Sequence, residues 1–215
     1  MIGFYNYTVI LTYIGLASSI IGMTAAMQQR YKTAIVCLMI SGLCDMFDGK
    51  VARTKKDRTE DEKKFGIQID SLCDVVCFGV FPAIIGYSLG IKRGLGLISM
   101  ILYVTAAVIR LGYFNVSEEK RQQETDENRK YYQGLPVTSA AIIFPLVFTL
   151  KGVAYKTFAM KFEIALIITA ILFITDFKMK KLTTKQMLIF LPVVLFILAR
   201  IILMGLGIDF YWLGV

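Results

Sequence analysis

Seven strongly apolar segments, separated by short polar stretches, dominate this chain of 215 residues. A helix needs about 20 apolar residues to cross the hydrocarbon core of a membrane. Because backbone groups in lipid must find their hydrogen bonds within the segment, each crossing segment is expected to be helical. The sequence therefore predicts an all-α fold, a polytopic transmembrane helical bundle. The segments run 7–27, 31–53, 65–89, 95–116, 136–150, 162–176 and 186–206, of which the fifth and sixth are short.

The charges lie between the apolar segments rather than along one stripe. Hydrophobic residues make up 56% of the chain and the net charge is +8. Basic residues in short gaps between membrane segments are placed to meet anionic lipid headgroups, and this distribution gives no indication of nucleic-acid binding. The longest polar stretch, 117–134, is predicted to be a connecting loop. Without a repeat or a separate soluble region, residues 1–215 are expected to form one integral membrane domain.

The Lys and Arg residues also predict the orientation. If residue 1 is cytoplasmic, the loops after the second, fourth and sixth segments hold about twice as many basic residues as the opposite loops, as the positive-inside rule requires. We therefore expect a multi-pass protein of the cytoplasmic membrane. The end of the second segment and the start of the third would then face the cytoplasm.

Four aspartates lie at those two segment ends, where an unpaired charge costs several kcal/mol. Positions three and four apart share a helix face, so Asp45 and Asp48 form one stripe, and Asp70 and Asp74 form another. If the stripes face each other, four carboxylates converge just below the membrane surface. Hard oxygen ligands at this density suit Mg²⁺, Mn²⁺ or Ca²⁺ and can hold two ions.

Small residues and one arginine accompany the carboxylates in the unit formed by residues 42–77. Gly49, Ala52 and Gly66 keep the helix faces open, so that a phosphate or nucleotide can approach the backbone. Arg53 offers a permanently protonated fork for phosphate oxygens. Taken singly, each charge has a simpler interpretation: it lies in water at a helix end, and the Arg53 side chain extends toward the membrane surface. The shared phase of four aspartates and two glycines favours a metal and phosphate site.

The pattern Asp45-x-x-Asp48-Gly49-x-x-Ala52-Arg53, followed by Gly66-x-x-x-Asp70-x-x-x-Asp74, resembles the signature of the CDP-alcohol phosphatidyltransferase family. One departure exists, because the twelve residues between Arg53 and Gly66 are more than the family usually has. The extra residues fall in the charged stretch 55–64. We expect them to lengthen a cytoplasmic loop and leave the site intact.

The resemblance implies transfer of a phosphatidyl group from a CDP-linked lipid to an alcohol, with release of CMP. By matching position, Asp45, Asp48, Asp70 and Asp74 would hold Mg²⁺ or Mn²⁺, with two ions per site. Asp74 would also be the catalytic base, and Gly49, Ala52, Arg53 and Gly66 would bind the CDP group. The resemblance further implies a six-helix core, to which the seventh segment is an addition, and a homodimer in the membrane.

The acceptor alcohol is suggested by further segments. Residues 74–82, 107–115 and 134–138 resemble the bacterial and archaeal phosphatidylserine synthases of that family, which implies CDP-diacylglycerol and L-serine as substrates. Arg110, inside the fourth segment, would suit a serine carboxylate, although a salt bridge to a motif aspartate is an equal alternative. Residues 134–136 are otherwise a simple passage from loop to helix, with Pro136 near the first turn.

Three alternatives remain open from the sequence. The acceptor would instead be glycerol 3-phosphate, inositol phosphate or another polar alcohol, or the protein would be a divalent-cation transporter, since ion pathways also use intramembrane carboxylates. The hydroxyls of Thr8 and Thr12 would line the donor site from the first segment with Asn6, or simply bond their own backbone. The four cysteines are expected to be small buried hydrophobes without disulfides.

Overall fold

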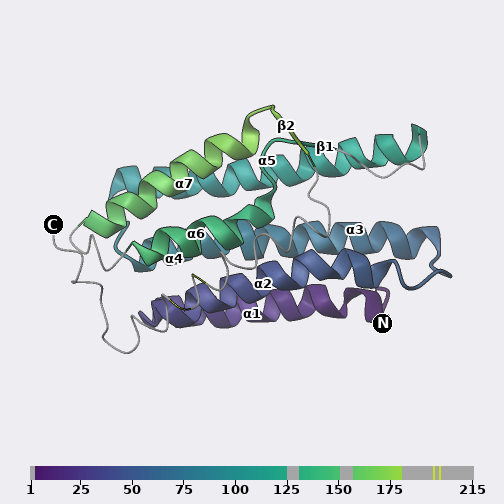
Figure 1. Ribbon diagram of the computed structural model, residues 1–215, viewed down its shortest axis with the longest axis horizontal. Helices are drawn as coiled ribbons and strands as arrows, with labels where there is room; N and C mark the ends of the chain where they lie inside the picture. The colour runs from purple at the N-terminus through teal and green to yellow at the C-terminus, as the bar shows by residue number, and fades with distance from the viewer. Residues whose placement is uncertain (1–2, 125–130, 151–156, 181–195, 197–198, 200–215) are drawn as a thin grey trace.

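The computed structural model describes residues 3–124, 131–150, 157–180, 196 and 199. Its long helices lie side by side along the longest axis (Figure 1), so the all-α prediction is confirmed. A π-helical segment, η2, joins α3 to α4 in one continuous helix. The helical elements are η1 (Tyr7–Val9), α1 (Ile10–Met27), α2 (Tyr31–Ala52), α3 (Glu60–Asp74), η2 (Val75–Val80), α4 (Phe81–Ser88), α5 (Gly94–Glu124), η3 (Val137–Ser139), α6 (Ala140–Thr149) and α7 (Phe158–Ile174).

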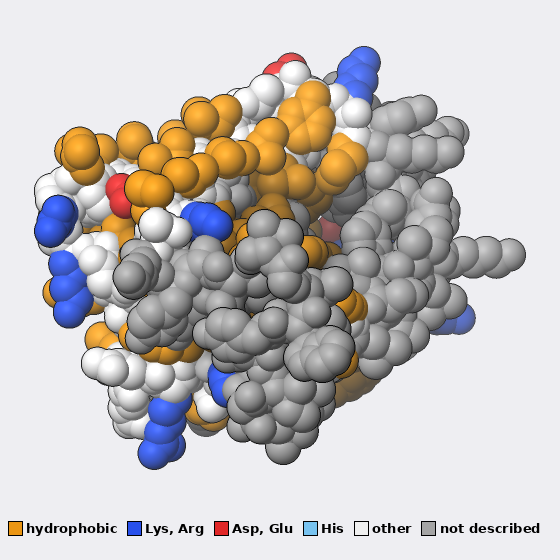
Figure 2. All heavy atoms as spheres, turned by 60° about the vertical axis from the view of Figure 1, so that its left-hand side comes forward, with side chains coloured by type: hydrophobic (Ala, Val, Ile, Leu, Met, Phe, Trp, Pro, Cys, Tyr) orange, Lys and Arg blue, Asp and Glu red, His pale blue; other side chains and the backbone are white. Residues whose placement is uncertain are grey.

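The outer surface of the bundle is apolar. Three helices are long and apolar enough to cross a membrane, Tyr7–Met27, Glu60–Ser88 and Gly94–Arg121, and Val137–Thr149 is a shorter apolar helix. Exposed isoleucines and leucines cover α1, α5 and α7, and broad hydrophobic patches are visible in Figure 2. Such a surface is stable in lipid rather than in water, so the chain is a helical membrane protein.

Six of the seven predicted apolar segments coincide with described helices, and the seventh, 186–206, lies outside the described residues except for Phe196 and Ala199. The third helix begins earlier than predicted, at Glu60, because Thr59 and Glu62 form a capping box at its start. The fourth, α5, continues to Glu124 into the stretch predicted to be a loop. An ion pair between Arg121 and Glu118, three positions apart, stabilises that extension.

A small strand pair was not predicted. Strands β1 (Tyr131–Gln133) and β2 (Lys178–Lys180) pair antiparallel, beyond the end of α7 (Figure 1). The hydrogen bonds continue past the strands, since the backbone N–H of Gly134 donates to Phe177 O and that of Leu135 donates to Leu172 O. Gly134 has φ +70°, a conformation that glycine adopts easily. The passage into α6 is thereby fixed against the end of α7.

Small residues set the spacing of the helices that carry the site. A Cβ atom added at Gly22 of α1 would lie 2.2 Å from Phe81 Cζ and 2.7 Å from Cys37 Cβ, and one added at Gly42 of α2 would lie 2.4 Å from the Cβ of Ala141. Close approach at small residues is the usual basis of helix packing in membranes. On the other side of the bundle, an aromatic cluster joins α5, α6 and α7 through Tyr103, Phe144, Phe148, Phe158, Phe162 and Phe173.

The two ends of the bundle carry different connections. The N-terminus, the loop between α2 and α3, and the C-terminal part of α5 lie at one end, whereas the α1–α2 and α4–α5 connections lie at the other (Figure 1). The N-terminus, the loop after the second segment and the stretch after the fourth, which were predicted to share a membrane side, therefore lie at one end of the molecule. Both halves of the aspartate motif border the loop at the first end.

Candidate active site

The carboxylates of α2 and α3 converge as the two predicted stripes require. One ligand oxygen from each of Asp45, Asp70 and Asp74 lies within 4.8 Å of the others. The fourth carboxylate, that of Asp48, approaches Asp70, while Asp45 approaches Asp74. Asp48 and Asp74 are buried, with exposed fractions of 7% and 8%, and Asp45 and Asp70 are half-buried. Four acidic groups thus share one partly enclosed volume between two helices.

This cluster has the chemistry of a divalent-cation site. Within the described part of the chain, the basic side chains form ion pairs with Glu60, Glu62 and Glu118, and none pairs with the four aspartates. Asp70 Oδ1 is buried and lacks a hydrogen-bond partner among the described residues. A buried acceptor without a donor is costly, and repulsion among the carboxylates adds to the cost. Oxygen ligands in this number fit Mg²⁺ or Mn²⁺.

Helix α1 closes the site from a third side. The hydroxyl of Thr12 donates to Asp48 Oδ2 at 3.1 Å, and both residues are buried. The hydroxyls of Thr24, Thr149 and Thr175 instead donate to carbonyls of their own helices, as is usual for threonine. The hydroxyl of Thr12 thus donates to a side chain of another helix and not to its own backbone. This contact could not be predicted from the sequence, because Asp48 lies 36 positions away.

A small cavity joins the three helices beside the carboxylates. Its wall includes three cysteines, and all four cysteines of the chain are buried and free. Next to it, Ser19 and Ser41 share a hydrogen bond and Ser41 also reaches backbone carbonyls, which joins α1 to α2. The cavity is lined by Thr12, Gly15, Ser41, Cys44, Asp45, Asp48, Cys73, Asp74, Cys77 and Phe78.

The helix that carries Asp70 and Asp74 changes its winding directly after Asp74. Residues Val75–Val80 form the π-helical η2, and the hydroxyl of Tyr103 on α5 donates to Phe78 O within it. Single π-helical turns inside α-helices occur frequently at functional sites. No residue pattern indicates this turn, since the segment is apolar and is typical of an ordinary α-helix.

The residues predicted to bind the CDP group lie on, or directly after, the two helices that hold the aspartates. Arg53 follows the last residue of α2, is exposed, and donates from Nε to Gly49 O at 2.9 Å. Ala52 is half-buried in the last turn of α2. Gly66 lies one turn before Asp70 on α3, so its open face continues that of the carboxylates.

Arg110 lies inside the bundle on α5, with an exposed fraction of 6%. Its Nε donates to Leu135 O at 3.2 Å, and its guanidinium lies 5.5 Å from the centre of the Phe114 ring. Residues 134–136, expected to be a simple passage into a helix, therefore also hold this side chain. Ser71 of α3 donates to Asn115 Oδ1 at 3.0 Å, which ties this part of α5 to the carboxylate helix.

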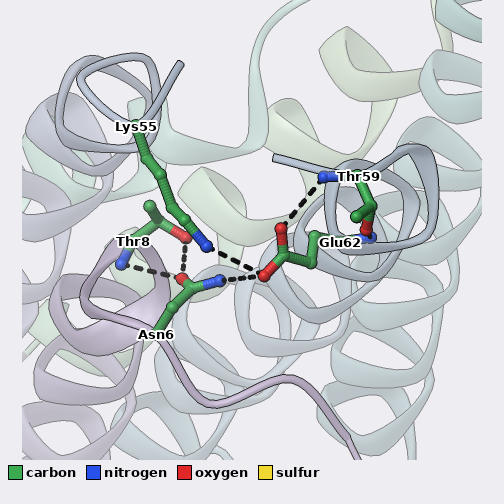
Figure 3. A network of polar contacts seen from close by, with 5 residues as sticks. All are labelled: Asn6, Thr8, Lys55, Thr59 and Glu62. Carbon is green, nitrogen blue, oxygen red and sulfur yellow. Dashed lines mark hydrogen bonds and ion pairs between the residues drawn. The ribbon is translucent and has the colours of Figure 1, made fainter. Parts of the chain in front are cut away.

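A single carboxylate joins three segments near the start of α3 (Figure 3). Glu62 Oε1 accepts from Asn6 Nδ2 at 3.2 Å and from Lys55 Nζ at 2.9 Å, and Glu62 Oε2 accepts from the Thr59 backbone at 3.0 Å. Asn6 in turn caps η1 by accepting from the Thr8 backbone N–H. The N-terminal segment, the α2–α3 loop and the start of α3 thus meet at Glu62.

The sequence was also compared with known protein families. The sequence model of the family described as CDP-alcohol phosphatidyltransferase matches residues 5–208. The chain belongs to that family. The match includes every residue of the carboxylate cluster and the helices that surround it, so the resemblance in the aspartate motif extends over nearly the whole chain.

Several similar proteins are named as enzymes that form lipids with a serine headgroup. A CDP-diacylglycerol–serine O-phosphatidyltransferase of Mycobacterium leprae is 28% identical over 178 residues, which cover 81% of this chain and 58% of that protein. One of Helicobacter pylori is 36% identical over 54% of this chain and 46% of its own length. An archaetidylserine synthase of Methanothermobacter thermautotrophicus is 31% identical over 62% of this chain and 53% of its own. The chain thus spans between about half and three fifths of these relatives.

The contacts of Glu62 predict that its loss lowers the thermal stability more than the loss of Glu60 does. Glu62→Ala removes one acceptor from three segments and should lower the Tm of the detergent-solubilised protein. Glu60→Ala, the matched control, removes only an exposed ion pair with Lys63, which contributes little. Thermal unfolding of the two variants measures the difference. Equal Tm values would show that Glu62 does not hold the segments together.

Proposed function

We propose that this protein transfers the phosphatidyl group of CDP-diacylglycerol to L-serine, giving phosphatidylserine and CMP. The observation that carries the proposal is the convergence of Asp45, Asp70 and Asp74 on one point beside the open helix faces of the family motif. The names of the relatives support serine as the acceptor, and their coverage of most of the chain supports an enzyme of this class.

The metal assignment follows from the donor set. Asp45, Asp48, Asp70 and Asp74 would hold Mg²⁺ or Mn²⁺, with two ions in the complete site, because they supply oxygen ligands and no described basic side chain forms an ion pair with them. When bound, the cations would polarise the phosphoryl group and stabilise the charge that develops on the leaving oxygen. Thr12 would orient the Asp48 carboxylate through the hydroxyl hydrogen bond.

Asp74 is the proposed catalytic base. In the transfer, the seryl oxygen forms a bond to the β-phosphorus, which bears the diacylglycerol, and the bond from that phosphorus to the CMP oxygen breaks. The hydroxyl proton passes to the Asp74 carboxylate. The protein has no histidine, so a carboxylate is a reasonable choice for this step. Gly49, Ala52 and Gly66 leave room for the nucleotide, and Arg53 offers its guanidinium to phosphate oxygens.

Arg110 is the proposed partner of the serine carboxylate. Arg110 is buried on α5, where the Leu135 carbonyl and the Phe114 ring hold its guanidinium in place. A carboxylate of the acceptor would balance that charge through a bidentate pair. The hydrogen bond between Ser71 and Asn115 keeps α5 against the helix that carries Asp74.

The alternatives are less well supported. A phosphorylated acceptor such as glycerol 3-phosphate or inositol phosphate would need a larger basic cluster beside the carboxylates. A cation transporter would need polar groups that continue through the bundle, whereas beyond the Ser19–Ser41 contact the described core around α2 contains Ala34, Ile35 and Leu38. Family membership also favours a transferase. We propose in addition that the site faces the cytoplasm from the cytoplasmic membrane, and that the protein is a homodimer.

The reaction is tested by CMP release from the purified protein with CDP-diacylglycerol and Mn²⁺ or Mg²⁺. We expect release that depends on L-serine, that glycerol 3-phosphate and inositol phosphate do not support, and that EDTA abolishes. Asp74→Asn should lower the rate by at least about 100-fold, the usual contribution of a general base. Asp61→Asn, exposed on the same helix, is the matched control and should remain active.

Each part of the proposal fails on a separate result. Release with another alcohol only would overturn the serine assignment and keep the transferase. Near-normal turnover of Asp74→Asn would remove the proposed base. No release with any acceptor would favour the transporter.

The role of Thr12 is tested by Mn²⁺ binding without substrate, measured as metal-dependent thermal stabilisation. Thr12→Val removes the donor to Asp48 and should weaken binding roughly 10- to 100-fold, as loss of a hydrogen bond to a metal ligand usually does. Thr12→Ser keeps the hydroxyl and should bind like the original protein. Thr24→Val on the same helix is the control, since that hydroxyl bonds only its own backbone. Unchanged binding by Thr12→Val would contradict the role.

A further inference from the structure

A basic side chain beside the site, that of Arg58, forms no ion pair with any described residue. Arg58 lies in the α2–α3 loop and is half-buried. Its Nε atom is buried and has no hydrogen-bond partner among the described residues. A buried guanidinium N–H that has given up water without gaining an acceptor is unfavourable. Such a group indicates an acceptor that binds from outside the protein.

Three other basic side chains of this region find acceptors. Lys55 pairs with Glu62, Lys63 pairs with Glu60, and Arg53 donates to the Gly49 carbonyl. Asp57 and Asp61 lie close to Arg58 in the chain, yet in the described part of the protein neither forms an ion pair with it. A shortage of carboxylates therefore does not explain the open guanidinium.

The position of Arg58 relative to α3 places its guanidinium beside the carboxylate helix. Its Nη1 lies 3.7 Å from the point where a Cβ at Gly66 would stand. Gly66 and Asp70 are four positions apart and share a helix face, so the guanidinium borders the open face that leads to the carboxylates. A phosphate group bound on this face would meet the guanidinium on one side and the carboxylate site on the other.

The loop is fixed on both sides of Arg58. Lys55, three positions before it, and Thr59, directly after it, both donate to the Glu62 carboxylate (Figure 3). Thr59 also accepts from the Glu62 backbone N–H at 3.2 Å. Because both flanks are held, little conformational entropy remains to be lost when the side chain binds a ligand. The extra length of this loop thus supplies a fixed basic group.

We propose that Arg58 binds the diphosphate of the CDP-linked donor, as a donor of charge-assisted hydrogen bonds to phosphate oxygens. The inference rests on the proposed function and adds a residue from outside the aspartate motif to the donor site. Its role is to bind the nucleotide diphosphate. Arg58 therefore affects the affinity for the donor and not the affinity for the acceptor alcohol.

The test compares CDP with cytidine as ligands of the purified protein, in a detergent without anionic lipid, by isothermal titration calorimetry. Arg58→Gln should weaken CDP binding roughly 10- to 100-fold, the cost of losing a hydrogen bond between charged groups, and leave cytidine binding unchanged. In turnover it should raise the KM for CDP-diacylglycerol and leave the KM for serine unchanged. Lys56→Gln, an exposed neighbour in the same loop, is the charge-matched control and should behave like the original protein.

The outcomes separate this inference from the proposed function. If the original protein binds CDP better than cytidine and Arg58→Gln binds CDP equally well, Arg58 is not part of the donor site, and the proposed function stands. That result would also follow if Arg58 bound only phosphates of bulk lipid. If the original protein does not distinguish CDP from cytidine, the proposed donor and this inference both fail. Arg58→Lys keeps the positive charge and nearly the same size but lacks the planar guanidinium. An affinity for CDP between those of the original protein and Arg58→Gln would support the proposal.

Discussion

Mutual repulsion among four aspartate carboxylates is the constraint around which this bundle is organised. Oxygens of three of them lie within 4.8 Å of one another, at the ends of two helices whose remaining surface packs in an apolar core. Repulsion at this range is strong when water is partly excluded. The surrounding structure opposes it in two ways, by the Thr12 hydrogen bond to Asp48 and by holding the ends of the helices in place through Glu62. A divalent cation would supply the main compensation.

The close packing of α1 on α2 makes that arrangement possible. Gly22 of α1 allows a close contact with Cys37 of α2 that a Cβ atom would block, and α1 thereby comes near enough for Thr12 to reach Asp48. The helices at the other side, α5 to α7, are joined by large aromatic side chains rather than small ones. The bundle therefore has a tightly spaced half that carries the carboxylates, and α5 brings Arg110 toward it from the aromatic half.

Hydropathy and helical periodicity were sufficient to predict the six described helical segments and the convergence of the aspartates. Both signals are local: a long apolar run must be helical in lipid, and residues three or four apart must share a face. The capping box at Thr59 and Glu62 was also readable from the residues, although the prediction began the helix later. Contacts between distant segments were not readable, among them Thr12 with Asp48, Asn6 with Glu62 and the pairing of β1 with β2. The π-helical turn after Asp74 depends on tertiary packing, including the hydrogen bond from Tyr103.

The central claim is that the four aspartates form a divalent-cation site, and locating the metal in crystals grown with Mn²⁺ tests it most directly. Anomalous scattering distinguishes manganese from water and from lighter ions. We expect an anomalous peak in contact with carboxylate oxygens of Asp45, Asp70 and Asp74, and a second peak nearby if two ions bind. A fully loaded crystal with manganese elsewhere and none between these carboxylates would contradict the claim.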